Sequence, residues 1–222
     1  ERGIRAKFVG HPIFDEWTPT TKHDLCNILN LNPDKLILTL YPGSRKQEIN
    51  RHLPLLINVA EKLKNKNSKI QFIFGLAYGL NLDHFSIPNW IQIEKNYPQK
   101  ALECADVALV ASGSATLEAA VFGTPMIIIY KMSILSWWIS KILVKADYAG
   151  MVNIIAGEKI MPEYIQTHAT VESITDKAFE IINSSDKQKV MKSELLSVKK
   201  KLKGSGASQR AARYILSLDK TK

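Results

Sequence analysis

Cysteine is scarce in this sequence, and its scarcity excludes several classes of site. The two cysteines, Cys26 and Cys104, lie far apart in the chain and match no spacing typical of zinc ligands. Two isolated cysteines are more typical of buried, reduced thiols in a cytoplasmic protein than of a disulfide framework. We therefore expect neither a disulfide scaffold nor a bound metal.

Long apolar runs are also missing. No stretch approaches the ~20 apolar residues needed to cross a bilayer, and no signal peptide is recognisable. A GxGxxG motif is absent, which argues against a dinucleotide cofactor. Internal repeats and low-complexity tracts are absent as well.

The composition that remains is that of a folded and strongly basic protein. Hydrophobic residues make up 45% of the 222 residues, enough for one large domain or one domain with appendages. The net charge of +9 favours anionic partners such as nucleotides, phosphates, acidic lipids or nucleic acid. The run Lys199-Lys200-Lys201 has no interleaved aromatic residues, so a solvated helix face is preferred over a nucleic-acid contact.

Residues 107–130 organise the rest of the chain. They are predicted to form a buried strand, a turn of small residues, a short helix and a second strand. Amides at a helix start bind anions, and Glu118, one turn into this helix, is suited to accept hydrogen bonds from sugar hydroxyls. This chemistry indicates a nucleotide site with a phosphate turn made of Ser112, Gly113, Ser114, Ala115 and Thr116. The alternative is an ordinary strand–turn–helix in which the helix dipole favours Glu118.

A similar corner comes earlier in the chain. A strand is predicted at 36–41, and an amphipathic helix follows at 46–63, with Ser44 placed to cap it. Arg45 at the helix start opposes the helix dipole, and a bound diphosphate would remove that conflict. Glu48 is placed to orient Arg45 through an ion pair. The alternative is a solvated pair that contributes little.

Strands and helices alternate from residue 36 to residue 130. This alternation predicts an α/β fold with a doubly wound, parallel, Rossmann-like sheet. In the Rossmann order the strand at 36–41 lies beside that at 107–111, so both corners would face one crevice at the switch point. The predicted strands are 6–9, 36–41, 70–74, 90–94, 107–111 and 126–130, and the predicted helices are 20–29, 46–63, 97–105, 133–144, 170–182, 186–202 and 208–218. Residues 149–157 are expected to form an apolar turn, and a short helix is expected to begin at 162.

Three further residues are candidates for the site. His11 lies between a glycine and a proline, in a loop suited to hold an imidazole in a cleft, although an exposed turn is the simpler interpretation. Asn153 and Glu163 are plausible site residues, with loop capping as the alternative. The predicted helix with Trp137-Trp138 suits either a membrane interface or the core.

Several motifs together resemble the C-terminal half of the lipid-A-disaccharide synthase family. They are FVGHP at 8–12, LYPGSRKQEI at 40–49, ASGSATLE at 111–118, GTPM at 123–126, LVK at 143–145, NIIAG at 153–157 and GASQRAA at 206–212. They cover nearly the whole chain in the order of the family. The SGxATLE element by itself is less specific, because related two-domain glycosyltransferases carry similar elements.

The resemblance implies the type B glycosyltransferase architecture, in which the active site lies between two Rossmann-like domains. Residues 1–168 would be the domain that binds the nucleotide sugar. Residues 169–222 would be a helical extension that packs on this domain or on a partner. The chain opens at Glu1 without a methionine, and we expect the N-terminal, acceptor-binding domain to be absent from it.

The implied reaction is an inverting glycosyl transfer of lipid A biosynthesis. A 2,3-diacylglucosamine passes from its UDP-linked donor to the 6-hydroxyl of 2,3-diacylglucosamine 1-phosphate, giving the β-1,6 disaccharide and UDP. The family needs no metal or other cofactor, is peripheral on the cytoplasmic side of the anionic inner membrane, and pairs through its C-terminal region. Because the base and most of the acceptor site are expected in the missing domain, this chain alone is expected to bind UDP or donor without catalysis.

Residue roles follow from the motifs. Arg45 and the 112–116 turn would hold the UDP diphosphate, and Glu118 would bind the ribose hydroxyls. The phosphate loop would be shaped by Gly43 and Ser44. The resemblance also implies that His11 lines the interdomain cleft and that Asn153 lies near the donor or leaving group, with Glu163 as a second donor-side candidate.

Two alternatives stay open at this point. The first is another type B enzyme acting on UDP-sugars, such as a peptidoglycan glycosyltransferase or a UDP-N-acetylglucosamine 2-epimerase; the Trp137-Trp138 helix and the Asn153 loop argue against both. The second is a non-catalytic nucleotide-binding or membrane-docking module that needs a separate N-terminal chain.

Overall fold

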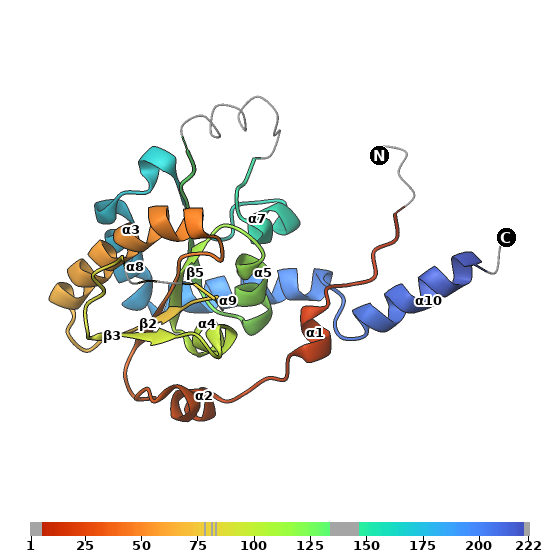
Figure 1. Ribbon diagram of the computed structural model, residues 1–222, viewed down its shortest axis with the longest axis horizontal. Helices are drawn as coiled ribbons and strands as arrows, with labels where there is room; N and C mark the ends of the chain where they lie inside the picture. The colour runs from red at the N-terminus through yellow and green to blue at the C-terminus, as the bar shows by residue number, and fades with distance from the viewer. Residues whose placement is uncertain (1–5, 78, 81, 83, 134–146, 220–222) are drawn as a thin grey trace.

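A six-stranded sheet forms the centre of the protein, seen in a computed structural model that describes residues 6–77, 79, 80, 82, 84–133 and 147–219 (Figure 1). Every neighbouring pair of strands is parallel, and their order is β3-β2-β1-β4-β5-β6. The predicted doubly wound parallel sheet is confirmed. The strands are β1 (Ile37–Tyr41), β2 (Gln71–Gly75), β3 (Ile91–Glu94), β4 (Val107–Ala111), β5 (Met126–Tyr130) and β6 (Glu163–Ile165).

Helices cover both faces of this sheet. On one face, α3 (Lys46–Lys66) and α8 (Val171–Ile182) pack against each other and against β4. On the other face, α4 (Pro98–Cys104) contacts β1 and β2, and α5 (Ala115–Phe122) contacts β4 and β5. The other helices are α1 (Ile13–Glu16), α2 (Lys22–Leu29), α7 (Met151–Ala156), α9 (Ser185–Lys201), α10 (Ala207–Asp219) and a 3-10 turn at Gln166–His168.

The twofold period of a strand decides which face each side chain covers. Along β1, Leu38 and Leu40 join the core under α3, whereas Ile37 joins the smaller core formed with α2 and α4. Thr39 also faces α4, and its hydroxyl donates to the carbonyl of Ala101 at 2.6 Å. All five residues of β4 are buried, as expected for a central parallel strand with helices on both faces.

The two cysteines, distant in sequence, meet inside the smaller core. Cys26 on α2 and Cys104 on α4 are free thiols, buried, with their Sγ atoms 3.4 Å apart. Burial raises the pKa of Cys104 far above its usual range. The prediction of buried, reduced thiols is therefore confirmed.

Three predicted elements are wrong. Residues 6–9 form no strand, residues 149–157 contain the helix α7 in place of an apolar turn, and β6 stands where a helix was expected to begin. β6 is only three residues long and is recognisable through its parallel pairing with β5, which is a tertiary contact. The predicted helix with Trp137-Trp138 falls on residues 134–146, outside the described residues. No helix within the described residues is long and apolar enough to cross a membrane.

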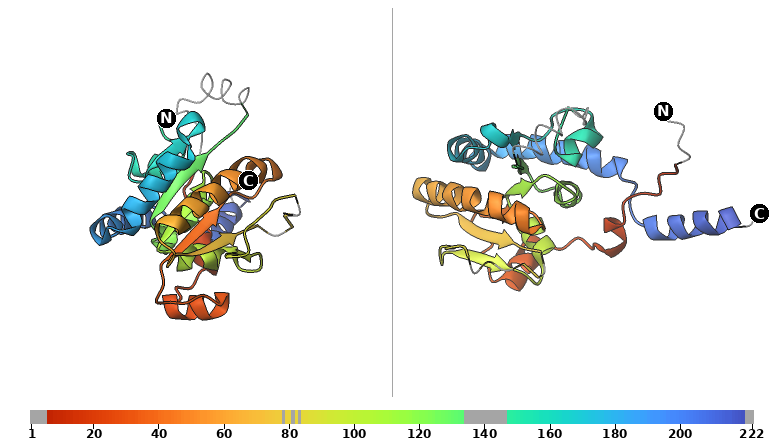
Figure 2. Two further views of the ribbon diagram at one scale, coloured as in Figure 1. Left: turned by 90° about the vertical axis from the view of Figure 1, so that its left-hand side faces the viewer. Right: turned by 45° about the horizontal axis from the view of Figure 1, so that its top comes forward.

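The two ends of the chain are fastened to each other. Asp15 in α1 accepts hydrogen bonds from the amides of Gly206, Ala207 and Ser208 and so caps α10. Arg210 donates through Nε to the carbonyl of Val9 at 2.7 Å. The segment leading into α1 therefore lies beside α10, which extends away from the sheet (Figure 2). The terminal motifs at 8–12 and 206–212 thus form one structural unit.

We expect Asp15→Ala to loosen α10 without unfolding the sheet. Three amides would lose their acceptor, so hydrogen exchange along α10 should speed up about tenfold. Hydrogen bonds from the 206–208 segment lower the pKa of Asp15 from 3.8 to about 2. This cap is therefore fully present above about pH 4 and is lost as the pH falls toward 2. Glu16→Ala is the control, and equal exchange rates in the two variants would contradict the capping role.

Candidate functional site

The candidate site lies at the carboxyl edge of the sheet, where β1 and β4 end next to each other. The two strands pair in parallel, with Tyr41 opposite Val110. The order of the strands reverses between them, because β2 and β3 lie on one side and β5 and β6 on the other. Open α/β sheets bind ligands at such a switch point.

A cleft of 470 Å³ occupies this switch point. The loops after β1 and β4 both line it, so the prediction that they face one crevice is confirmed. The cleft brings together eight of the predicted residues: Gly43, Ser44, Arg45, Ser112, Gly113, Ser114, Ala115 and Glu118. Thr116 lies behind the turn, fully buried, and its hydroxyl donates to the carbonyl of Gly113 at 2.8 Å.

Glu48 holds the loop after β1 in shape. Its Oε2 accepts from the amides of Ser44 at 3.1 Å and Arg45 at 3.3 Å. Gly43 has φ +109° and passes so close to Glu48 that a Cβ would lie 2.4 Å from Oε2, so a side chain there would break this contact. The prediction that Ser44 caps α3 is wrong, because Arg45 is the N-cap residue and the carboxylate of Glu48 satisfies the amides.

The Arg45 side chain extends from this loop toward solvent. It is 83% exposed, and its only ion pair in the described part of the chain is with Glu48 at 3.4 Å. Exposed pairs at this distance contribute little free energy. The predicted pair exists, and it leaves the guanidinium available to an anion in the cleft.

The loop after β4 is fixed from outside the cleft. The hydroxyl of Ser112 donates to the carbonyl of Ala149 at 2.6 Å. The amides of Thr116, Leu117 and Glu118 bond back to carbonyls in the turn. The earlier amides of the turn, at the start of α5, lie at the cleft, where a helix start favours an anion.

Glu118 places a carboxylate in the cleft with an unused acceptor. Its Oε2 is buried and has no hydrogen-bond partner among the described residues. Burial raises the pKa of Glu118, and its charge adds to the burial that raises the pKa of neighbouring Tyr41. A buried unsatisfied acceptor costs free energy. A ligand that donates hydroxyl hydrogens at this point would offset that cost.

A buried histidine connects the cleft loop to the end of β5, and the sequence analysis missed it. His52 is fully buried on α3. Its Nδ1 lies 2.8 Å from the carbonyl of Pro42, and its Nε2 accepts from the amide of Lys131 at 2.9 Å. These partners require a neutral ring with the proton on Nδ1, and burial lowers the pKa of His52 accordingly. The signal was a polar residue on the apolar side of a predicted helix.

The cleft also has a wall that was not predicted. Lys95 and Asn96 line it from the segment that joins β3 to α4, and Gln99 lines it from the first turn of α4. Lys95 directly follows the last residue of β3. The rule that ligands bind at the carboxyl ends of parallel strands, which selected the loops after β1 and β4, also points to Lys95. Within the described residues, no three His, Cys, Asp or Glu side chains are grouped so as to hold a metal ion.

Comparison with known families identifies the chain. A family model described as lipid-A-disaccharide synthetase matches residues 1–216. The chain belongs to the lipid-A-disaccharide synthetase family. Lipid-A-disaccharide synthases of Coxiella burnetii (strain CbuG_Q212) and Syntrophus aciditrophicus (strain SB) are 33% and 36% identical to it over 98% and 99% of its length. The chain spans 59% of the length of each of these relatives.

Solved structures show the same fold at low sequence identity. The calicheamicin glycosyltransferase CalG4 superposes with a TM-score of 0.54 and 16% identity, over 85% of this chain and 43% of CalG4. A putative UDP-N-acetylglucosamine 2-epimerase from Listeria monocytogenes superposes with a TM-score of 0.58 and 12% identity, over 96% of this chain and 54% of the epimerase. These likenesses concern the Rossmann-like fold alone.

The two predicted donor-side residues, Asn153 and Glu163, lie behind the cleft. Asn153 is fully buried, and its amide donates to the carbonyl of Met161 and to Glu163, both at 2.8 Å. Glu163 also accepts from the amides of Ala149 and Gly150. Because the carbonyl of Ala149 accepts from Ser112, this network reaches the 112–116 turn indirectly. Neither Asn153 nor Glu163 lines the cleft.

His11 is also outside the cleft. Its Nδ1 accepts from the amide of Ile13 at 3.2 Å, and its own amide donates to the carbonyl of Leu202. Partial burial lowers the pKa of His11. It belongs to the junction between the two ends of the chain described above.

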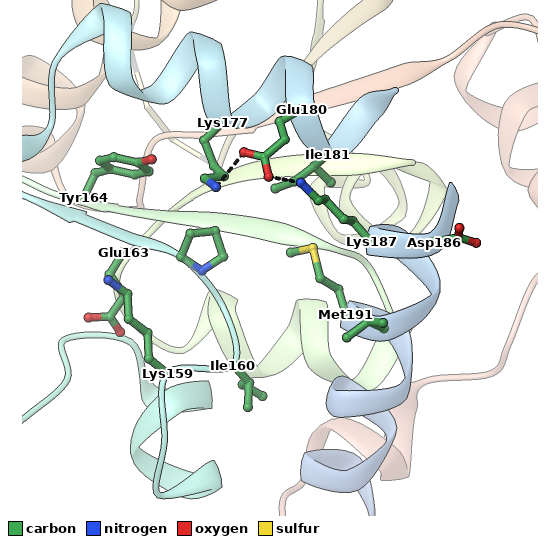
Figure 3. A pocket seen from close by; sticks show the side chains of 12 residues that line it. Lys159, Ile160, Glu163, Tyr164, Lys177, Glu180, Ile181, Asp186, Lys187 and Met191 are labelled. Atoms are coloured by element: carbon green, nitrogen blue, oxygen red, sulfur yellow. Dashed lines mark hydrogen bonds and ion pairs between the residues drawn. The ribbon is translucent and has the colours of Figure 1, made fainter. Parts of the chain in front are cut away.

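A larger cavity of 610 Å³ lies away from the switch point, between β6, α8 and α9 (Figure 3). Lys177 and Lys187 both point to Glu180 across its rim, so the charges there are paired with each other. Of the predicted site residues it includes Glu163, whose carboxylate is engaged with backbone amides. The volume of a cavity therefore does not identify the candidate site. The smaller cleft is preferred because it lies at the switch point and contains an unsatisfied acceptor.

We expect His52→Leu to destabilise the fold by about 2 kcal/mol, because two buried backbone groups lose their partner. The neutral histidine stabilises the protein at high pH, and this contribution is lost as the pH falls below about 6.5 toward the lowered pKa of the folded state. The difference in free energy of unfolding between wild type and variant should therefore shrink from pH 8 to pH 5. Denaturant titrations at both pH values measure it, with His23→Leu, an exposed histidine, as control. A constant difference would contradict the neutral-bridge assignment.

Proposed function

We propose that this chain is the donor-binding half of a lipid A disaccharide synthase. The donor would be UDP-2,3-diacylglucosamine and the acceptor 2,3-diacylglucosamine 1-phosphate, giving the β-1,6 disaccharide and UDP. Family membership supports the reaction class. The observation that carries the donor-binding role is the buried, unsatisfied Oε2 of Glu118, a residue that lines the same cleft as Arg45.

In this proposal the cleft binds UDP in two parts. The ribose hydroxyls donate to Glu118, which satisfies its buried oxygen. The diphosphate lies between the amides at the start of α5 and the guanidinium of Arg45. Such donors stabilise negative charge that develops on a leaving group, so departure of UDP needs no metal ion. Residues 1–168 would form this domain, with 169–222 as the helical extension.

The chemical step is a displacement at the anomeric carbon of the donor. The 6-hydroxyl of the acceptor forms the new glycosidic bond, and the bond to the β-phosphate oxygen breaks with its electron pair leaving on UDP. Inversion follows from attack on the face opposite UDP. The hydroxyl proton passes to a base, which we assign to the part of the relatives that this chain does not span, together with most of the acceptor site.

The residues behind the cleft would affect donor binding indirectly, by positioning other residues. Asn153 and Glu163 would position the Ser112 turn, and His11 would fix the end of the chain that faces the interdomain cleft. We further propose a peripheral position on the cytoplasmic face of the inner membrane, where the net positive charge favours an anionic surface. Exposed Ile215 and Leu216 on α10 support pairing with a second copy through the C-terminal helices.

Calorimetric titration with UDP tests the donor site. Arg45→Ala should lose about 1–3 kcal/mol of binding free energy, as expected for a charge-assisted contact with phosphate. Glu118→Gln should also weaken binding, yet keep or raise the melting temperature at pH 7, because the buried charge with its raised pKa destabilises the folded state. Lys192→Ala, an exposed lysine on α9, is the control. Unchanged UDP affinity in both cleft variants would sink the donor-site assignment.

The isolated chain should bind donor without turning it over. A radiolabel assay with donor and lipid acceptor should yield no disaccharide from this chain alone, because the proposed base and acceptor site lie outside it. Robust product formation would refute the assignment of a donor-binding half. Hexosamine acceptors and an epimerase assay, run in parallel on a chain completed to the length of its relatives, separate the synthase from other type B enzymes acting on UDP-sugars.

A further inference from the structure

A second hollow adjoins the cleft on the side of β5. Its volume is 460 Å³, and it lies between the first turns of α3 and the carboxyl end of β5. Arg45 and Glu48 line both this hollow and the cleft. The rest of its lining is Lys46, Gln47, Arg51, Tyr130, Lys131 and Met132. We call it the β5 hollow.

The β5 hollow carries more positive charge than its own acid neutralises. Of the described residues that line it, four are cationic and one, Glu48, is acidic. The oxygens of Glu48 are already engaged with the loop amides and with Arg45. Lys46, Arg51 and Lys131 have no acidic side chain within ion-pair distance among the described residues.

Lysines with acidic partners occur elsewhere in the described residues. On the α3–α8 surface, Lys62 pairs with Glu172 and Lys66 with Asp176, and at the larger cavity Lys177 and Lys187 pair with Glu180. Three of these pairs join two helices, whereas Lys177 and Glu180 both lie on α8. An unneutralised cationic group lining a concave surface is the arrangement expected for an anionic ligand.

The cations of the β5 hollow stand on fixed backbone. Arg51 lies on the second turn of α3, directly before buried His52, and it is only partly exposed. Lys131 directly follows β5, and its amide is held by His52 at 2.9 Å. One buried neutral side chain therefore sets the spacing between the two cationic positions without adding charge. The first-turn amides of α3 lie at the same hollow, where the helix dipole favours an anion.

We propose that the β5 hollow binds a phosphate monoester of a second ligand, beside the nucleotide. Arg51 and Lys131 supply most of the charge, and the exposed Arg45 lies between the two anions. Because Glu48 separates the two sites, the UDP diphosphate would occupy the cleft and leave the β5 hollow free. The inference rests on the proposed function in one respect: a phosphate held here would place a bound sugar phosphate next to the donor, where the second substrate of a glycosyl transfer belongs.

A phosphate monoester could come from a sugar phosphate or from an anionic lipid headgroup, and one experiment separates the two. The chain saturated with UDP is titrated with N-acetylglucosamine 1-phosphate and followed by NMR, with N-acetylglucosamine as the phosphate-free comparison. In a second arm the chain is sedimented with phosphatidic acid vesicles, with phosphatidylcholine vesicles as comparison. The sugar phosphate is the expected ligand.

Substitutions of Arg51 and Lys131 test whether the β5 hollow binds the phosphate. Arg51→Gln and Lys131→Gln should each weaken sugar phosphate binding about tenfold, whereas Arg51→Lys should retain most of it. UDP affinity should stay unchanged in all three, because neither residue lines the cleft. Lys192→Gln controls for net charge. If the glutamine variants lose only vesicle binding, the phosphate site stands and its ligand is the lipid headgroup.

Equal phosphate binding by wild type and both glutamine variants, in both arms, would overturn the inference. This failure is distinct from failure of the proposed function. If UDP does not bind but sugar phosphate binding still depends on Arg51 and Lys131, the donor-site assignment is wrong and the β5 hollow assignment stands. If UDP binding depends on Arg45 and Glu118 but sugar phosphate binding is unchanged in the Arg51 and Lys131 variants, the donor-site assignment stands and the β5 hollow assignment is wrong.

Discussion

The parallel pairing of β1 with β4 is the constraint on which the candidate site depends. These strands are separated by some 65 residues of chain, yet their registered ends place two loops on either side of one cleft. Each loop alone offers an ordinary strand–turn–helix corner. A guanidinium from one corner and a carboxylate from the other face the same space only because the strand order reverses at this point.

The loops are held in place by the protein itself. Glu48 satisfies the amides after β1, Thr116 closes the turn after β4, and His52 fastens Pro42 to the end of β5. These internal bonds remove much of the ordering cost that a ligand would otherwise bear. Against this background the buried, unpartnered oxygen of Glu118 is an exception. Native proteins leave few buried polar groups unsatisfied, and functional sites are among the places where they do.

A second level of contacts supports the site from a distance. Asn153 and Glu163 fix the segment at Ala149, and that segment accepts the hydroxyl of Ser112. At the far end of the molecule, Asp15 and Arg210 join the first and last motifs of the chain. Motif residues such as Asn153 and Arg210 therefore lie outside the cleft and hold backbone segments in place.

Local sequence patterns were enough to predict the class of the fold and the two loops that line the cleft. Apolar runs long enough for buried strands alternate with amphipathic helices, and glycine, serine and arginine follow the strands in patterns that local chemistry explains. The remaining features of the fold and the site depend on contacts between segments that are distant in the chain. β6 became a strand through its pairing with β5, and Asn153 became a buried connector because Met161 and Glu163 surround it. The bridge made by His52 and the β5 hollow depend on which segments meet in space. A local sequence pattern does not tell how far apart two residues lie when they are 79 positions apart in the chain, as His52 and Lys131 are.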